Sequence, residues 1–222
     1  MPLYFLPRER LATTAPAGLG WTASFTYDPI NPSPTICGAN LLTDARGGDA
    51  ISSSGMCDQR PIERRPDGLI FTTPSLSTPV EVTGDVRAEL WITTDVPDTD
   101  LSVRITDVYP DGRSMLILDN TMRARYHASR DFSTFQLLQP GVPVKLTFDI
   151  GPTSLVLNTR HRLRAIVTGS NAPRFLPNPN TGAMFLKAGA TTRVAHTQLL
   201  LDAPHPSRII VPLKELISGQ WR

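Results

Sequence analysis

Hydrophobic and polar residues alternate along two neighbouring runs in the middle of the chain. In the first run, the even positions 86–92 are aliphatic, whereas the odd positions 87–93 are polar or aromatic. In the second run, apolar residues recur at every other position from 101 to 105. A period of two is typical of a half-buried β-strand. Because turn-forming residues occupy 95–100 and 109–112, the pattern predicts three antiparallel strands in succession.

Short aliphatic and β-branched runs recur along the rest of the chain, and none has the period of an α-helix. They lie at residues 3–6, 21–27, 69–73, 80–83, 114–118, 122–126, 143–151, 163–168, 191–201 and 207–213. Eight or more strands without helical crossovers are typical of two packed antiparallel sheets. The sequence therefore predicts an all-β protein, and we favour a jelly-roll β-sandwich.

The strand pattern is dense only in the later part of the chain. Residues 1–66 are rich in turn formers, and we interpret them as an irregular leader that wraps the domain. Residues 67–222 then form the jelly-roll β-sandwich. With 222 residues and 40% hydrophobic content, the chain is long enough to bury one core. A proline-rich loop at 171–182 interrupts the strands, and its stiffness favours contact with a partner.

Charge and hydropathy exclude two classes of partner. The net charge is +2, and the best basic cluster is Arg160, Arg162 and Arg164, predicted on one face of a strand. A solvated or partner-facing strand explains this cluster at least as well as phosphate binding, so no nucleic-acid partner is predicted. No run of 18 apolar residues occurs, so no membrane span is predicted. The first ten residues lack a basic signal-peptide start, which predicts a cytoplasmic protein.

The two cysteines, Cys37 and Cys57, leave two alternatives open. They could close a loop by a disulfide in an oxidising compartment, or they could be free thiols in a reducing cytoplasm. Two thiols do not make a zinc site. We favour the free thiols.

No complete catalytic constellation can be assembled from the sequence. The nucleophile-elbow pentapeptide Gly-x-Ser-x-Gly is absent, and Ser52, Ser53 and Ser54 before Gly55 have the composition of a flexible loop. His205 is a candidate general base because a carboxylate lies three residues before it, although a turn histidine between prolines is the favoured interpretation. We therefore predict no catalytic residue and no cofactor. The histidines also lack metal-ligand spacing; they are His127, His161, His196 and His205.

Acidic turn residues offer a weaker candidate site. Asp95, Asp98 and Asp100 could bind calcium, but short acidic turns between strands are common, and no metal site is predicted. Asp107 and Asp111 are expected to cap backbone amides in their turn.

Trp91 is expected on the polar side of its strand. It could stack on a sugar, or it could be covered by another domain.

Several motifs occur in one order along nearly the whole chain, at residues 27–29, 58–67, 82–91, 98–113, 171–182 and 205–212. Together they resemble the C-terminal β-domain of the X-Pro dipeptidyl-peptidase and cocaine-esterase (CocE/NonD) hydrolases. The resemblance implies a galactose-binding-like jelly roll that packs against a preceding α/β-hydrolase domain and stabilises it. That domain carries the family's catalytic serine, aspartate and histidine. Cys37 and Cys57 depart from the family pattern.

Two functional hypotheses follow. In the first, the chain is the non-catalytic half of a serine hydrolase acting on esters or X-Pro amides, with an α/β-hydrolase domain or subunit as its partner. This hypothesis predicts an exposed apolar patch that includes Trp91 and the loop 171–182. In the alternative, the chain is a stand-alone jelly-roll module that binds carbohydrate or protein. A homo-oligomer is a further partner hypothesis.

Overall fold

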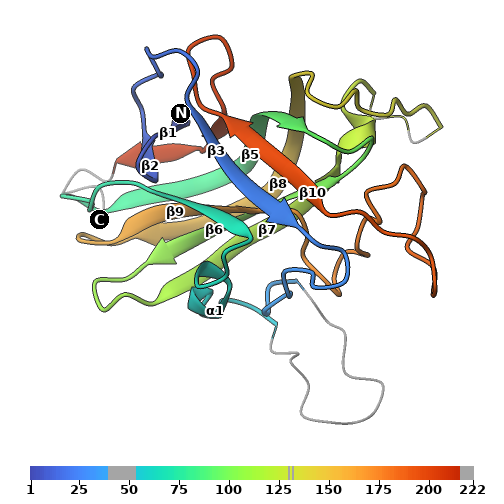
Figure 1. Cartoon of the computed structure of the whole chain (residues 1–222). Helices are drawn as coiled ribbons and strands as arrows, with labels where there is room; N and C mark the ends of the chain where they lie inside the picture. Colours follow the sequence, from blue (N-terminus) through green and yellow to red (C-terminus); the bar gives the residue numbers. More distant parts are fainter. Residues whose placement is uncertain (40–53, 130, 132, 216–222) are drawn as a thin grey trace, which may run out of the picture.

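The fold is almost entirely β. The computed structural model describes residues 1–39, 54–129, 131 and 133–215. Within them lie a one-turn helix, α1 (Arg60–Glu63), a 3₁₀ turn, η1 (Ala124–Tyr126), and the strands of Figure 1. The strands are β1 (Pro2–Leu6), β2 (Arg10–Ala12), β3 (Thr22–Tyr27), β4 (Gly68–Thr72), β5 (Val80–Thr94), β6 (Asp100–Val108), β7 (Ser114–Arg123), β8 (Val144–Leu157), β9 (Arg162–Thr168), β10 (Ala195–Leu200), β11 (Arg208–Ile210) and β12 (Leu213–Glu215).

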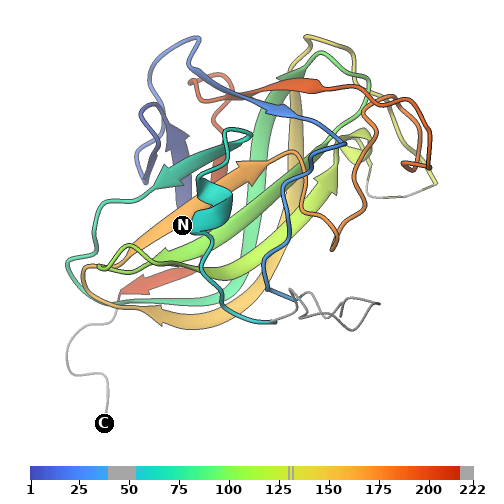
Figure 2. The same ribbon diagram turned by 60° about the horizontal axis from the view of Figure 1, so that its bottom comes forward.

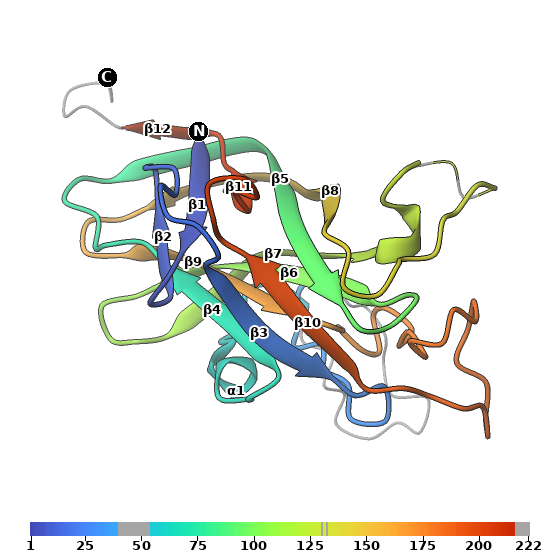
Figure 3. The ribbon, with the colours of Figure 1, turned by 45° about the horizontal axis from the view of Figure 1, so that its top comes forward.

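Two layers of strands enclose the core. One contains β3, β10, β5 and β8, and the other contains β4, β9, β6 and β7. Figure 3 shows β3, β10 and β5 in front of β6, β7 and β9. The layers are not separate sheets, because the short strands β11, β1 and β2 connect them into one continuous sheet. The pairs are antiparallel, except that β2 pairs parallel with β4 at Arg10 and Thr72. The predicted all-β sandwich is confirmed, whereas the jelly-roll topology stays a prediction.

Alternating residues form the core as their spacing predicts. Val86, Ala88, Leu90 and Ile92 of β5 are all buried, and they face apolar residues of the opposite layer. The side chains from that layer are Phe71, Leu101, Val103, Ile105, Leu163, Ala165 and Val167. Each buried aliphatic side chain contributes about 1.5–3 kcal/mol through the hydrophobic effect, so this double row is the main source of stability.

Residues before position 67 contribute strands as well as loops. The strands predicted at 3–6 and 21–27 correspond to β1 and β3, which pair with β11 and β10. The segment that follows β3 crosses the outer face of the β6–β7–β9 layer, together with α1 (Figure 2). There the amide of Ser33 donates a hydrogen bond to Ser170 Oγ at 2.8 Å. The division into a leader over 1–66 and a sandwich over 67–222 stays a prediction.

The expected free thiols are wrong, because Cys37 and Cys57 form a disulfide. Residues 57–59 pair with the start of β7, where the Leu116 amide donates to the carbonyl of Cys57. Gly38 and Gly55 also exchange two backbone hydrogen bonds beside the disulfide. These contacts hold the two cysteine Cα atoms 5.8 Å apart, within the range that a disulfide requires. Ser52 and Ser53 lie outside the described residues.

Candidate docking surface at the 169–194 loop

β6 is buried on both of its faces. Leu101, Val103 and Ile105 face the core, while Asp100 and Arg104 face outward and are nevertheless at most 4% exposed. β7 and β9 flank the strand, and residues 28–38 with the loop after β9 cover its outer face. Buried charged groups require partners, so this outer face must satisfy each of them internally.

Two ion pairs lie side by side at one end of this outer face. Asp98 accepts hydrogen bonds from Arg125 Nε at 2.9 Å and Nη2 at 2.7 Å, and both side chains are at most 1% exposed. Asp100 of β6 lies opposite Arg123 of β7 and accepts from its Nε at 3.0 Å. Charge-assisted, bidentate pairs of this kind are among the strongest protein hydrogen bonds.

Asn178 joins the two carboxylates to the loop. Its side-chain Nδ2 donates to Asp98 Oδ2 and to Asp100 Oδ1, both at 2.8 Å. Its backbone carbonyl accepts a hydrogen bond from Tyr27 Oη at 3.0 Å. Burial raises the pKa of Asp100 to about 6 against the opposing effect of Arg123. Burial by itself lowers the pKa of Arg123, but the nearby carboxylates of Asp100 and Asp98 together outweigh it, so the pKa of Arg123 is raised.

The outer N–H groups of both arginines bind the loop backbone. Arg125 Nη2 donates to the carbonyls of Gly182 and Ala183, both at 3.0 Å. Arg123 donates to the carbonyls of Leu176 and Met184. The loop is therefore tied to η1 and the end of β7 at several points between residues 176 and 184.

A second cluster holds the base of the same loop. Arg104 donates to Asn171 Oδ1 at 2.9 Å and to Thr168 Oγ1 at 2.9 Å. Asn171 Nδ2 in turn donates to Asp119 Oδ2 at 2.6 Å, and Arg174 pairs with the other carboxylate oxygen of Asp119. Burial lowers the pKa of Arg104 to about 10.

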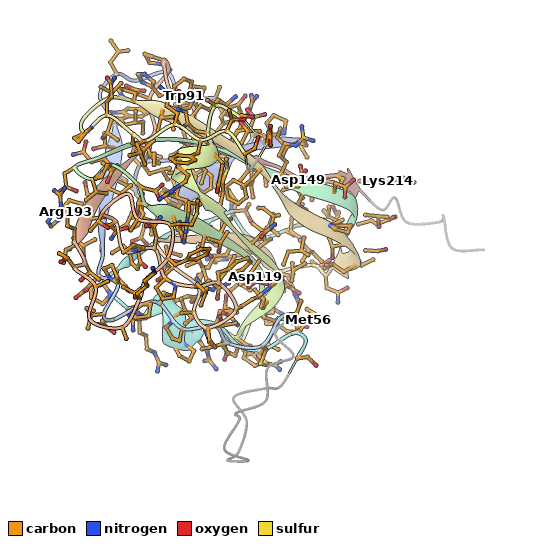
Figure 4. All side chains as sticks on the ribbon, turned by 90° about the vertical axis from the view of Figure 1, so that its right-hand side faces the viewer. Met56, Trp91, Asp119, Asp149, Arg193 and Lys214 are labelled. Carbon is orange, nitrogen blue, oxygen red and sulfur yellow. A yellow bond between two sulfur atoms is a disulfide. The ribbon has the colours of Figure 1, made fainter. Side chains whose placement is uncertain are left out.

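Exposed apolar side chains surround the anchored loop. Phe135, Leu137, Leu176, Met184 and Phe185 are 36–67% exposed, and we call these five residues the docking surface. Phe135 and Leu137 lie in the loop between η1 and β8, and the other three residues lie in the 169–194 loop. Arg125 connects these two loops, because its guanidinium lies 5.0 Å from the centre of the Phe135 ring and 3.9 Å from the Met184 sulfur. Both loops extend from the same side of the molecule in Figure 1, and Figure 4 turns this side toward the viewer.

Comparison with known proteins agrees with this architecture. Residues 8–210 match the family described as the X-Pro dipeptidyl-peptidase C-terminal non-catalytic domain. The chain belongs to this family. It is 33% identical over 202 residues to cocaine esterase from Rhodococcus sp. (strain MB1 Bresler), a match that covers 90% of this chain and 34% of that protein.

Solved structures show where the family fold occurs. The crystallised α-amino acid ester hydrolase is 26% identical, with a TM-score of 0.85 over 96% of this chain and 36% of that chain. An aminopeptidase from the marine sediment archaeon Thaumarchaeota archaeon is 24% identical with a TM-score of 0.86 over the same shares, which shows the fold alone. The chain spans about a third of the length of these relatives.

In this family member, the three candidate calcium ligands have other partners. Asp98 and Asp100 pair with arginines, while Asp95 Oδ1 accepts from the His196 amide at 2.8 Å. No group of three His, Cys, Asp or Glu side chains is placed to hold a metal ion within the described part of the chain. Nor does any helix there have the length and apolar character needed to cross a membrane.

The expectation that Asp107 and Asp111 cap amides is half right. Asp111 Oδ1 accepts from the Arg113 amide at 3.0 Å. Asp107 instead pairs with buried His161, with 2.8 Å between its Oδ1 and the imidazole Nδ1. Burial raises the pKa of Asp107. The pairing was missed because it requires the turn before β9 to approach β6.

His205 does meet the carboxylate proposed from the sequence, since its Nδ1 lies 3.0 Å from Asp202 Oδ1. Asp202 also accepts from the Gly20 amide, so the pair fastens two loops. Ser207 is fully buried and bonded to the backbone of Trp91, which leaves it inaccessible as a nucleophile. Trp91 packs edge-on against His205 at 5.1 Å rather than joining the docking surface.

The predicted arginine stripe is wrong in part. Arg160 lies in the turn before β9 with a φ of 71°, because the strand begins only at Arg162. Arg164 is bound to Glu63 at 2.5 Å and to Thr72 Oγ1 at 2.9 Å. Arg164 of the predicted stripe is therefore bound within the protein rather than facing a partner. Of the remaining histidines, His127 has its Nδ1 at 3.0 Å from the Ala124 carbonyl, and His196 lies in β10, where its amide binds Asp95.

Proposed function

We propose that this non-catalytic β-domain binds an α/β-hydrolase catalytic domain through its docking surface and stabilises it. The observation that carries the proposal is the group of five exposed apolar side chains on two neighbouring loops, of which the 169–194 loop is held by the arginines of buried ion pairs. Soluble proteins seldom expose several large apolar residues together on their surface, except where a partner binds. Loops of this length without strands or helices also tend to be functional.

The reaction of the complete hydrolase is the hydrolysis of esters or X-Pro amides by acyl transfer to a serine. The relatives named as an esterase and an amino acid ester hydrolase support this class. The serine, the histidine and the oxyanion hole would belong to the catalytic domain, which supplies the nucleophile and stabilises the tetrahedral intermediate. The role of this chain is to position and stabilise that domain, whether it is encoded in the same polypeptide or as a separate subunit.

An activated-ester assay tests the proposal. We expect turnover from the α/β-hydrolase that co-purifies with this chain, and none from the purified chain alone. Leu176→Asp and Phe185→Asp should each weaken association with that hydrolase by about tenfold or more, as truncation of buried interface anchors does. Val156→Asp is the matched control, because Val156 is an exposed aliphatic residue of β8 outside the docking surface. Ester turnover by the chain alone, or normal association of both loop variants, would overturn the proposal.

The cytoplasmic location and the homo-oligomer stay predictions. The Cys37–Cys57 disulfide is a pairing more typical of oxidising compartments. Peptide mapping of the protein from its source, under non-reducing conditions, would decide the location: a free-thiol form supports the cytoplasm, and a complete disulfide contradicts it.

A further inference from the structure

We propose that Arg123 and Arg125 are positioning residues that hold residues 174–185 in the docking conformation before the partner binds. This inference rests on the proposed docking function and deepens it. The two arginines act through the loop that carries Leu176, Met184 and Phe185.

The geometry places each arginine between a fixed carboxylate and the loop. The segment 98–100 runs antiparallel to 123–125, and the Ala124 amide donates to the Thr99 carbonyl at 2.8 Å between the two ion pairs. Both guanidinium groups therefore point to the same side, two residues apart. Each arginine donates a hydrogen bond from Nε to a carboxylate and from a terminal nitrogen to loop carbonyls.

The loop needs such an external support because it has little of its own. Residues 169–194 contain neither a strand nor a helix. The Arg193 amide binds the Pro179 carbonyl and Tyr27 Oη binds that of Asn178, but no backbone ladder fixes the carbonyls of Leu176 and residues 182–184. The arginines supply donors for four loop carbonyls: Arg125 binds those of Gly182 and Ala183 in partly buried hydrogen bonds, and Arg123 binds those of Leu176 and Met184 in exposed ones. Partly buried carbonyls without partners are costly, so the Arg125 contacts are expected to matter most.

Only arginine has the shape for this task. Arg125 donates to Asp98 from Nε and Nη2, and Nη2 also donates to the carbonyls of Gly182 and Ala183. A lysine ammonium is a compact point charge that can retain the ion pair but cannot span both sides. Replacement by lysine thus separates the charge from the bridging function.

Preorganisation has a measurable consequence for docking. A loop that samples many conformations in the free protein must be ordered on binding, and the apparent dissociation constant rises by the inverse of the competent fraction. We expect Arg125→Lys and Arg123→Lys to weaken association with the hydrolase about tenfold while the charge is unchanged.

Hydrogen exchange on this chain tests the anchoring directly. The amide of Phe175, which donates to the Asn171 carbonyl at 2.9 Å, and the amide of Asn180, which donates to Asn178 Oδ1 at 2.9 Å, report on the loop. Arg125→Lys and Arg123→Lys should accelerate exchange of both by about tenfold or more and leave β5 and β8 unchanged. Arg87→Lys is the control, since Arg87 forms an exposed pair with Asp149 on β5 and β8.

Each outcome separates the inference from the function on which it rests. Unchanged loop exchange in both variants overturns the inference, and so does faster exchange with unaltered affinity for the hydrolase. If the wild-type chain fails to bind the hydrolase while the variants still loosen the loop, the docking function fails and the anchoring stands. Where Arg125→Lys does not fold, Arg123→Lys carries the same test, because Arg123 is partly exposed.

Discussion

The two faces of β6 are equally buried but are built from opposite chemistry. On the inner face, Leu101, Val103 and Ile105 pack into the core between the layers. On the outer face, Asp100 and Arg104 meet counter-charges and amides beneath the 169–194 loop. The inner face can tolerate repacking by residues of similar volume, whereas the outer face depends on individual hydrogen bonds.

This difference separates what stabilises the fold from what shapes its surface. Apolar packing is non-directional and holds the layers together wherever it is sufficient. Charge-assisted hydrogen bonds have defined directions, so the outer face can fix a strandless loop in one conformation. We therefore expect damage to the inner face to lower global stability, and damage to the outer face to lower stability and also release the loop.

The largest effect is expected at the buried pair of Asp98 and Arg125. Asp98→Ala leaves an uncompensated guanidinium that is 1% exposed, which should destabilise the protein by about 3–5 kcal/mol in urea unfolding. Hydrogen exchange should also accelerate in the loop through the lost Asn178 contact. A loss below about 1 kcal/mol would show that the charge is solvated and that the outer face is not closed.

The matching change on the inner face is Leu101→Ala. Deleting a fully buried leucine costs about 3 kcal/mol, through the lost transfer free energy and the cavity that remains. Global unfolding should shift accordingly, while the relative exchange of loop and core amides stays as in the wild type. Selective loosening of the loop by this variant would contradict the distinction between the two faces.

The inner face is what alternation in the sequence predicts best. The even positions of 86–92 and of 144–150 face the core as expected. A period of two assigns side chains to the two faces of a strand without any tertiary information. The same reasoning treats the opposite side as exposed. For β6 this is wrong, since the spacing within a strand says nothing about which distant segments cover its polar side.

The prolines in the sequence indicate the 169–194 loop, but they do not indicate the residues that anchor it. Their positions favour Asp98 and Asp100 as turn residues or calcium ligands. The sequence does contain one signal for the ion pairs: these two acidic residues and the two basic residues Arg123 and Arg125 share a spacing of two on segments predicted to be near one another. Recognising the pairs requires the register of β6 against β7, which contains an irregularity between Ile105 and Thr106. The disulfide was missed for a similar reason, since it depends on residues 57–59 pairing with β7.

The disulfide fastens the segments that cover the outer face, and its removal should have the next largest effect. A bond between cysteines 20 residues apart stabilises the folded state by about 2–3 kcal/mol, mainly by restricting the unfolded chain. A Cys37→Ser/Cys57→Ser variant should unfold at correspondingly lower urea concentration, and reductant should shift the wild type but not the variant. An identical midpoint with and without reductant would show that the cysteines are not bonded in solution.

The smallest predicted effect concerns how Asp100 responds to pH. Its folded-state pKa of about 6 lies above the unfolded value of ~3.9, so the folded protein holds a proton there that the unfolded chain has released. The stability from this group is fully present below pH ~3.9 and is lost as the pH rises through 6. Asp100→Asn lacks this titration.

The comparison of wild type with Asp100→Asn isolates this group, because Asp107, whose pKa burial also raises, is common to both proteins. The unfolding free energy of the wild type relative to the variant should fall by about 2 kcal/mol between pH 4 and pH 7. An increase over this range would mean that Arg123 outweighs burial and holds the folded-state pKa below its unfolded value. In that case the outer face would resemble an exposed ion pair more than a buried one, and the contrast between the faces of β6 would weaken.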